Sequence, residues 1–396
     1  MSRSVCLLLM IALPAMARAQ DGPTQLLAST LAPSEELSSS GEALTPLVSS
    51  RPWERWYGSA EYLLWWLQEG RIPGLLSAGM PGTSAIPGQD PDARWINGPG
   101  RLQTRHGDRF CGIRATLGCW LDAEETWAIE GEAFFLERDS TEFEAVSDGN
   151  PTLAVPRFNP AKGIVESHIV AGAVPGGTRG GGMVGYTRVE LFGQQANLVR
   201  AVDVPWLSQL DLLLGVRFLE MRDRADPTTV SRLYPDGSSI IGTEDHLRAH
   251  NFFYGGQIGA RGRFDWRRWT IDGRGLAAFG ADRQLVRTWG YTITHARQSR
   301  RVDTHGLFIY PSNSGRFQRN TFDMVYEVGA NLRYQLTDCI QFFGGYTLIL
   351  WCFPIRAGDQ IDTVVDPSQA IARPTIPWRD DLLWAQGLNL GLRFGW

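Results

Sequence analysis

The chain has 396 residues, long enough for one large β domain or two ordinary domains. Its 38 basic and 42 acidic side chains nearly balance, which argues against nucleic acid as a partner. The 44 glycines exceed the usual share of about 7%. Composition therefore leaves the fold open, and the pattern along the chain must decide it.

The N-terminus has the features of a secretory signal. Arg3 provides a positive charge, Val5 to Leu13 form an apolar run, and Ala17-Arg18-Ala19 forms an A-x-A cleavage site. We expect residues 1–19 to be a signal peptide. Residues 20–52 are rich in Ser, Pro and acidic residues without sustained periodicity, which predicts a flexible periplasmic lead-in. No later stretch approaches the roughly 18–20 apolar residues of a membrane helix.

Residues 53–396 are dominated by segments in which apolar and polar residues alternate. A period of two indicates strands with one apolar and one polar face. The segments are 56–66, 111–121, 127–135, 184–198, 210–218, 252–263, 269–279, 322–335, 340–350 and 384–396. The last segment places Trp384, Leu388, Leu390 and Leu392 on one face and Asn389 on the other. Its final residue is aromatic, as in the closing strands of outer-membrane β-barrels.

Connections between these segments alternate between short and long. Long connections cover 68–109, 137–183, 221–249 and 352–381, and the first two are rich in Gly and Pro. This asymmetry is typical of transmembrane barrels with short periplasmic turns and long external loops. The segment 281–321 is ambiguous and contains either two more strands or a hairpin above the membrane. We therefore predict an all-β, antiparallel, up-and-down transmembrane barrel of about 12 strands, or 10 if that segment is excluded.

Aromatic residues fall near both ends of the apolar faces. Two such groups are what anchoring at the two membrane–water interfaces predicts. The expected interface aromatics are Trp56, Trp66, Trp127, Phe135, Trp269, Trp384 and Trp396.

Sixteen charged residues fall on the opposite faces and are expected to line the lumen. They are Glu61, Arg114, Glu130, Glu132, Arg188, Glu190, Asp211, Arg217, Arg261, Arg263, Asp272, Arg274, Asp323, Glu327, Arg333 and Arg393. Charges at this depth must face water or each other. One interpretation is a hydrated pore with a transverse field. The alternative is an interior filled by ion pairs.

The sequence contains no pattern that predicts a catalytic, cofactor or metal site, and we expect no enzymatic activity. The histidines 106, 168, 246, 250, 295 and 305 fall in predicted loops or at strand ends. His295, His305, Asp380 and Asp381 are the candidates to test for hydrolysis at the outer rim. The sequence Gly180–Gly185 matches GxGxxG but opens no helix, so it lacks the scaffold that binds phosphate.

Four cysteines remain after the signal peptide. Cys111 and Cys119 lie about 26 Å apart on one strand, at about 3.3 Å per residue, and cannot form a disulfide. Pairs of Cys111 with Cys352 and of Cys119 with Cys339 are conceivable, but free thiols are favoured because neither pair lies on neighbouring strands.

Several segments resemble an outer-membrane beta-barrel porin family, the one numbered seven. The resemblance rests on 59–67 (SAEYLLWWL), 116–122 (TLGCWLD), 253–259 (FYGGQIG), 311–315 (PSNSG), 357–362 (AGDQID) and 384–387 (WAQG). It covers nearly everything after Arg51. The resemblance implies an outer-membrane barrel and supplies no catalytic residues.

We therefore expect an exported protein of the outer membrane that allows passive diffusion of small polar solutes. The alternative is a non-conducting surface anchor whose external loops bind a partner or an envelope component. Expected partners are outer-membrane lipid, small solutes, and the barrel assembly machinery through the C-terminal strand. Oligomeric state and solute selectivity are left open.

Overall fold

The computed structural model describes residues 55–96, 109–234, 239–296 and 299–395, which lie in one compact unit, Ser50–Trp396. These residues form antiparallel strands and a 3-10 turn, η2 (Gly358–Gln360). Within the described ranges, no helix has the length and apolar character needed to cross a membrane. The expected signal peptide and lead-in (1–52) lie outside the described residues and remain predictions.

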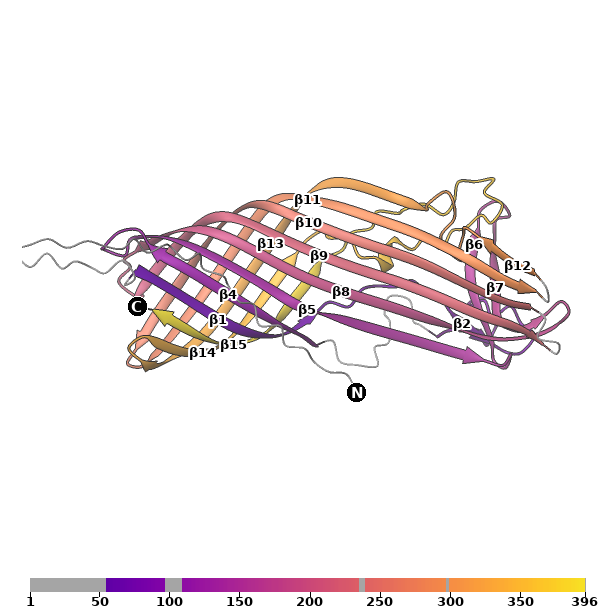
Figure 1. Ribbon diagram of the computed structural model, residues 1–396, viewed down its shortest axis with the longest axis horizontal. Helices are drawn as coiled ribbons and strands as arrows, with labels where there is room; N and C mark the ends of the chain where they lie inside the picture. Colours follow the sequence, from indigo (N-terminus) through magenta and orange to yellow (C-terminus); the bar gives the residue numbers. More distant parts are fainter. Residues whose placement is uncertain (1–54, 97–108, 235–238, 297–298, 396) are drawn as a thin grey trace, which may run out of the picture. The chain divides into compact units, whose positions relative to one another are not determined.

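A closed antiparallel ring of strands forms the barrel (Figure 1). The final strand pairs with the first, for example Leu392 with Ala60, so the ring has no free edge. Strands β8 and β9 also pair with each other along their length, which completes the ring. In order around the ring, the strands are β1 (Trp56–Leu67), β4 (Arg109–Trp120), β5 (Trp127–Ser147), β8 (Gly177–Val202), β9 (Gln209–Tyr234), β10 (Ser239–Trp266), β11 (Trp269–Ala296), β13 (Gly315–Thr337), β14 (Ile340–Trp351) and β15 (Leu383–Gly395).

Among the described residues the ring therefore has ten strands. The count of twelve is wrong, because residues 281–296 continue β11 and do not form a separate strand. Residues 299–303 form β12 (Ser299–Asp303), which pairs only with β11 and lies outside the ring. The alternative hairpin interpretation of 281–321 describes this region better.

The strands of the ring differ greatly in length. β1, β4 and β14 have 12 residues, whereas β10 and β11 have 28. A strand crosses a bilayer in about 9–11 residues, so the long strands continue well beyond it. They do so at the end with the long connections, which we call the long-loop end; the short turns and the start of β1 lie at the other end (Figure 1). Much of the predicted loops 137–183 and 221–249 therefore belongs to strands.

An apolar belt surrounds the ring where all ten strands are present. Its outward side chains are large, apolar and exposed, as contact with lipid requires. Examples are Ile113 (65% exposed), Leu214 (62%), Val328 (60%) and Leu390 (53%). The lumen-facing residues between them, such as Arg114 and Glu327, are polar. The alternation thus follows the pleat of the strands through the membrane.

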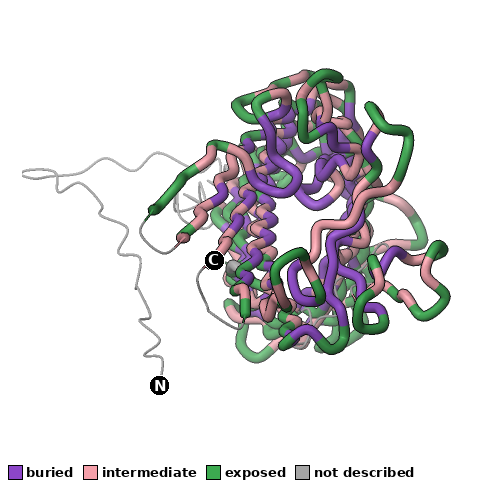
Figure 2. The backbone as a smooth tube through the Cα atoms, turned by 90° about the vertical axis from the view of Figure 1, so that its right-hand side faces the viewer, coloured by how far each residue is buried: buried purple, intermediate pink, exposed green. Residues whose placement is uncertain are grey.

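The polarity of the two faces is reversed where the long strands leave the belt. Met183 on β8, Leu247 on β10 and Val286 on β11 point inward into an apolar core, while their neighbours meet water. Four short strands, β2 (Ser77–Gly79), β3 (Arg94–Trp95), β6 (Thr152–Asn159) and β7 (Ile164–Val174), form a sheet that continues from β8. Residues of β2, β6 and β7 pack into this core. Figure 2 shows buried segments gathered inside the wall at the long-loop end.

Candidate functional site

A layer of paired charges crosses the lumen within the membrane-spanning part. Three guanidinium groups from three strands meet Glu327 on β13: Arg217 at 2.6 Å, Arg114 at 3.9 Å, and Arg274. Glu132 on β5 also receives Arg274 at 2.6 Å and Arg114 at 3.5 Å. All five side chains are at most 13% exposed. These five side chains are therefore shielded from bulk water by one another and by their neighbours.

A second group of charges lies closer to the short turns. Arg261 on β10 donates to Glu130 and to Asp211, each at 2.9 Å. Arg333 pairs with Asp272 at 2.7 Å. Each guanidinium therefore has a carboxylate within reach, which is the condition for burying charge at low cost.

An apolar layer separates the charges from the long-loop end. Trp65 is fully buried there, and its Nε1 donates to Asn389 Oδ1 at 2.8 Å. The Arg114 guanidinium lies 5.2 Å from the centre of the Trp65 ring and 5.7 Å from that of Phe134. The layer consists of buried side chains from across the ring: Leu63, Trp65, Leu67, Phe110, Phe134, Leu136, Val189, Leu191, Leu219, Met221, Phe253, Ala278, Val325, Ile349, Trp351, Leu383 and Ala385.

Residues 353–361, which connect β14 towards β15, fold into the lumen above this layer; we call them the plug. Asn251 on β10 holds Ile355 through two hydrogen bonds of 2.8 Å, one to its N–H and one to its C=O. Asp323 accepts the N–H of Phe353 at 3.0 Å. Inward polar side chains of the wall thus satisfy the backbone of a connection that would otherwise be buried without partners.

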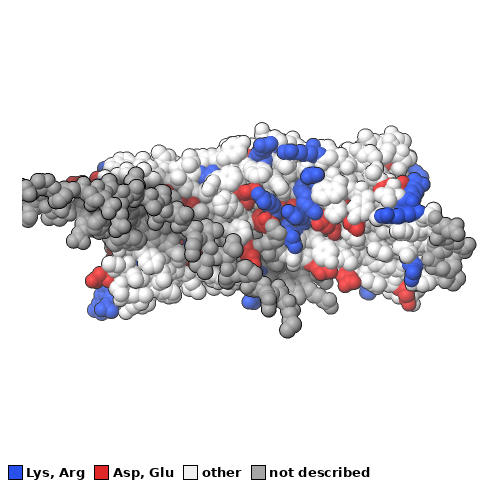
Figure 3. Space-filling model, viewed as in Figure 1, with Lys and Arg blue, Asp and Glu red and all other residues white. Residues whose placement is uncertain are grey.

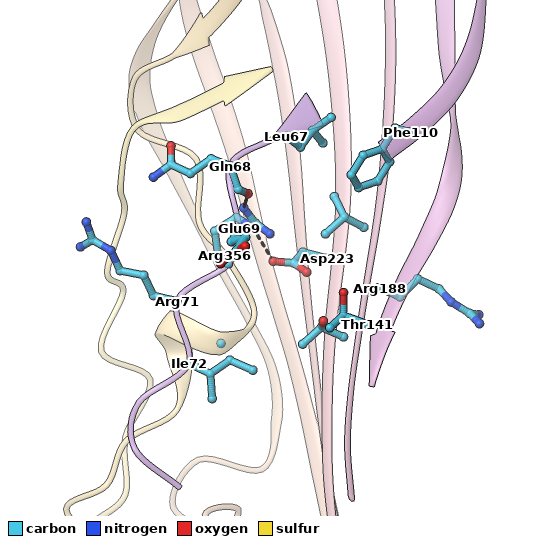
Figure 4. A pocket seen from close by; sticks show the side chains of 14 residues that line it. Leu67, Gln68, Glu69, Arg71, Ile72, Phe110, Thr141, Arg188, Asp223 and Arg356 are labelled. Atoms are coloured by element: carbon cyan, nitrogen blue, oxygen red, sulfur yellow. Dashed lines mark hydrogen bonds and ion pairs between the residues drawn. The ribbon is translucent and has the colours of Figure 1, made fainter. Parts of the chain in front are cut away.

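The plug also has a charged contact with the wall. Arg356 Nε donates to Asp223 on β9 at 2.6 Å, and the N–H of Ala357 donates to the same carboxylate at 3.1 Å. Figure 4 shows these two side chains pointing toward one another, whereas Arg71 and Arg188 point away. Both charged side chains are at most 7% exposed. The contact fixes the plug to the wall.

A second connection is held by Asp245 of β10. Its carboxylate accepts the N–H groups of Leu307, Phe308 and Ile309 at 2.9 to 3.1 Å. A side chain at Gly306 would collide with this carboxylate. Burial raises the pKa of Asp245 to about 6, although the three N–H donors oppose this shift. The connection between β12 and β13 is therefore anchored by a group that titrates near neutral pH.

Two small cavities lie in the interior of the described part of the barrel. One cavity of about 50 Å³ lies among the charges and is lined by Glu61, Arg274, Arg333 and Arg393, among others. Another of about 60 Å³ lies beside Asp223. These volumes suit a few water molecules and not a diffusing solute.

The structure places most of the predicted lumen residues on the inner face. Glu61 faces Arg114 at 3.7 Å, and Asp323 lies next to the plug. Arg393 lies over the ring of Tyr57 at 5.2 Å. Arg263, whose side chain is 36% exposed, contacts Gln209 near the short turns. The pore-lining role of these residues remains a prediction.

Two of the predicted lumen residues are misplaced. Arg188 and Glu190 lie on the outer face, because their neighbours Val189 and Leu191 point into the apolar layer. The cause is the reversal of polarity described above: beyond the belt, water meets the outer face and a protein core fills the inner one.

The predicted interface aromatics face outward wherever they are described. Trp56, Trp127, Phe135 and Trp269 are 38 to 46% exposed, and Trp66 and Trp384 are partly exposed. Trp396 lies outside the described residues.

The structure describes five of the six histidines. His246, His250 and His295 lie within β10 and β11, because these long strands extend past the membrane, and His168 lies within the short strand β7. Burial, with help from Arg157 and Arg179, lowers the pKa of His168 to about 4. His106 lies outside the described residues.

The hydrolase candidates are engaged elsewhere. His305 stacks on Tyr310 with ring centres 4.9 Å apart. Asp380 pairs with Arg319, and Asp381 with Arg71. In the described part of the chain, no group of three His, Cys, Asp or Glu side chains is arranged to hold a metal. The cysteines at 111, 119, 339 and 352 are free.

Sequence reasoning missed the polar residues that hold the connections: Asp223, Asp245, Asn251 and Gln284. The Nε2 of Gln284 donates to the carbonyl oxygen of Phe353 in the plug at 2.7 Å. Asp223 and Asp245 fall in a predicted loop, 221–249. The sequence pattern around these two residues is weak, because residues 221–249 alternate between polar and small side chains and contain few large apolar ones.

A closed ring with an exposed apolar belt and a polar interior defines a transmembrane β-barrel of the outer-membrane type. The family model described as "Putative beta barrel porin-7 (BBP7)" matches residues 57–396. The chain belongs to this family, as the sequence resemblance predicted. The comparison with curated proteins found no match.

The solved structures to which the chain is similar include outer-membrane barrels. The outer membrane protease OmpT from Escherichia coli is 10% identical, with 86% of this chain and 97% of that chain covered and a TM-score of 0.31. A FadL homologue from Pseudomonas aeruginosa is 8% identical, with 86% and 90% covered and a TM-score of 0.20. The toluene transporter TodX from P. putida is 8% identical, with 86% and 89% covered and a TM-score of 0.16.

The expectation that the protein is not an enzyme requires correction. One of the similar barrels is a protease, and a fold by itself neither excludes nor assigns catalysis. The likeness concerns the fold and assigns no activity to this chain.

Proposed function

We propose that the protein is a non-conducting outer-membrane barrel that anchors its long-loop end at the cell surface, where it contacts a partner or an envelope component. The observation that carries this proposal is the filling of the lumen by paired charges, an apolar layer and the plug. Short turns are periplasmic in barrels of this type, so we assign the long-loop end to the outside.

The burial of the lumenal side chains argues against an open channel. A water-filled pore leaves its lining accessible to water, yet Glu327 and Trp65 are inaccessible and Arg217 is 3% exposed. Opening a path through the charged layer requires breaking buried pairs. Removing one partner of such a pair costs about 3–5 kcal/mol, so thermal fluctuation opens it rarely.

The long-loop end has the properties of a binding platform. An apolar core joins the long strands to β2, β6 and β7, so this end is held together by its own packing. Its surface carries a groove of about 280 Å³ lined by Trp95, Phe158, Pro87 and Arg157, among others. Phe158 is 41% exposed. Exposed aromatic side chains of this kind are enriched where proteins bind partners.

Passive diffusion of small polar solutes is the second candidate. The family description and the polar lining of the membrane-spanning lumen favour it. This function requires both the plug and the apolar layer around Trp65 to move.

Planar bilayer recording of the refolded protein distinguishes the two functions. We expect no conductance steps from wild-type protein that resists extraction from liposomes and migrates as a folded barrel. An open trimeric porin, inserted into the same bilayers, is the positive control. Regular steps from the folded wild-type protein would overturn the proposal and favour diffusion.

Binding of the long-loop end is tested separately on intact cells. Surface labelling of a cysteine placed at Met80, which is 55% exposed, should succeed without permeabilisation. Labelling only after the outer membrane is permeabilised would place this end in the periplasm and contradict the proposal.

A further inference from the structure

Five arginines lie directly opposite one another on five neighbouring strands. Arg188 on β8 pairs in register with Arg224 on β9, which pairs with Arg248 on β10. Arg248 pairs with Arg287 on β11, which pairs with Arg316 on β13. With strands about 4.8 Å apart, this arginine row is about 19 Å long.

The arginine row lies on the outer face of the wall. The neighbours of its members along the strands point inward: Val189, Ala225, Leu247 and Val286 are buried in the interior. Side chains alternate between the faces, so the arginines point outward. Arg287 and Arg316 are exposed, and the other three are partly exposed. Figure 3 shows basic side chains, with acidic ones beside them, across the middle of this face.

A row of like charges is unfavourable in the sheet itself. Like charges directly opposite each other destabilise a strand pair. Asp226, which contacts Arg248, and Glu190 lie in the rows on either side, but at these five positions every residue is arginine. Arg248 and Arg287 also lie 5.1 and 5.3 Å from the ring centre of Trp289, which helps to fix both guanidinium groups. The arrangement is suited to an external anion that contacts several guanidinium groups together.

The arginine row lies close to the apolar belt. The outward aromatic residues nearest to the row on its belt side are Phe192 on β8 and Phe252 on β10. Each lies four residues from the arginine of its own strand. Four residues span about 13 Å along a strand, or about 10 Å of height for a strand tilted by 35–45°. On β8, β9 and β10 and the adjoining β4 and β5, the lipid-facing surface has a groove of about 730 Å³, lined by Ala133, Ala196 and Tyr254, among others.

We propose that the arginine row binds the phosphate groups of a phosphorylated saccharide lipid in the outer leaflet, with an acyl chain in this groove. Guanidinium groups match phosphate oxygens in charge and in planar two-point geometry. The polar layer of a bilayer is about 5–8 Å thick on each side. The arginine row lies about 10 Å above the last outward aromatic residues, so a phosphate attached directly to the glycerol of a phospholipid does not reach it. A saccharide between acyl chains and phosphate supplies the missing length.

The inference does not depend on whether the lumen conducts. It concerns only the outer face of the wall. The net charge of −4 gives no indication of the arginine row, because acidic residues elsewhere in the chain compensate for its charge. Each arginine near the membrane surface strengthens the binding of an anionic lipid by about fivefold.

Native mass spectrometry of the folded barrel in detergent tests the proposal with three lipids. They are an acylated glucosamine disaccharide with a phosphate on each sugar, the same lipid without phosphate, and phosphatidylglycerol. We expect the phosphorylated saccharide lipid to bind at least about tenfold more tightly than either of the others. Such a preference corresponds to about 1.4 kcal/mol.

The variant Arg224→Gln/Arg287→Gln should bind this lipid about 30-fold more weakly, which corresponds to about 2 kcal/mol. Arg232→Gln is the matched control, because Arg232 is an exposed outward residue of β9 whose register partners are Gly180 and Ile240. All three proteins should retain the migration of a folded barrel. Equal binding of the lipid without phosphate, equal binding of phosphatidylglycerol, or unchanged binding by the double variant would each overturn the proposal.

Discussion

Arg356 Nε lies 2.6 Å from Asp223 Oδ2, although the two residues are 133 positions apart in the chain. This pair joins the connection after β14 to β9, a strand four places away around the ring. The connection is therefore part of the barrel interior. Its position depends on a few buried polar contacts.

Replacing Arg356 with Met should destabilise the plug. The change leaves the Asp223 carboxylate buried without its charged partner, at a cost of about 3–5 kcal/mol. We expect faster proteolytic cleavage within residues 352–382 and a lower urea midpoint. Arg71→Met is the control, because Arg71 is 60% exposed in its pair with Asp381 and should cost less than about 1 kcal/mol. Similar effects from both changes would contradict the role of the buried pair.

Replacing Glu327 with Gln should weaken the charged layer of the lumen. Arg114, Arg217 and Arg274 would then lose their shared carboxylate, and we expect a loss of about 3–5 kcal/mol. The measurement is the temperature at which the barrel loses its compact electrophoretic migration. Glu220→Gln serves for comparison, since its partner Arg222 is 47% exposed. If Glu327→Gln melts like wild type, the layer does not stabilise the barrel.

The Asp245 contact should make stability depend on pH. Burial raises the pKa of its carboxyl from 3.8 to about 6, so the folded protein holds this proton more tightly than the unfolded chain. The stabilisation is complete below pH 3.8 and is lost as the pH rises through about 6. The difference between these two pKa values corresponds to about 3 kcal/mol.

The measurement is urea unfolding of wild type and Asp245→Asn between pH 4 and 8. The asparagine variant does not titrate, so the difference in unfolding free energy between the two proteins should change by up to about 3 kcal/mol, in favour of wild type at low pH. A difference that stays constant over this range would show that Asp245 has an ordinary pKa.

Introducing a charge into the apolar belt should impair folding into lipid. Leu390 on β15 is 53% exposed, and an arginine there would cost about 2–4 kcal/mol near the middle of the bilayer. The folded fraction after dilution into liposomes, read from electrophoretic migration, should fall. Val302→Arg is the matched control, because Val302 is 54% exposed but lies on β12, outside the ring. Equal folded fractions for the two variants would mean that Leu390 does not face lipid.

The membrane-spanning part was predictable because one physical rule governs it. Lipid outside and polar groups inside make every second residue apolar, from Trp56 in β1 to Leu392 in β15. The ten segments of alternation all correspond to strands of the ring. The strand count was ambiguous only at 281–321, where β11 leaves the membrane and this rule ends.

The long-loop end was harder to predict because its two faces meet different surroundings. On β10, the inward residues Leu247 and Ala249 are apolar and point into a core, while the outward residues His246 and Arg248 meet water. Nearer the turns the outward face of the same strand is apolar, as at Ile258. The same reversal explains why Arg188 and Glu190 were wrongly predicted to face the lumen. The pairing of Asp223 with Arg356 joins distant segments, and neither residue carries a local pattern that identifies its partner.

The hydrogen bond from Trp65 to Asn389 joins residues 324 positions apart, across the seam between the first and last strands. Closing so long a loop is entropically costly and slow, so this seam is among the last contacts to form. Until β15 arrives, β1 has an unpaired edge that other chains can pair with. Successful biogenesis therefore requires that the edge of β1 be shielded throughout synthesis and export, and that release follow only after the final strand has docked.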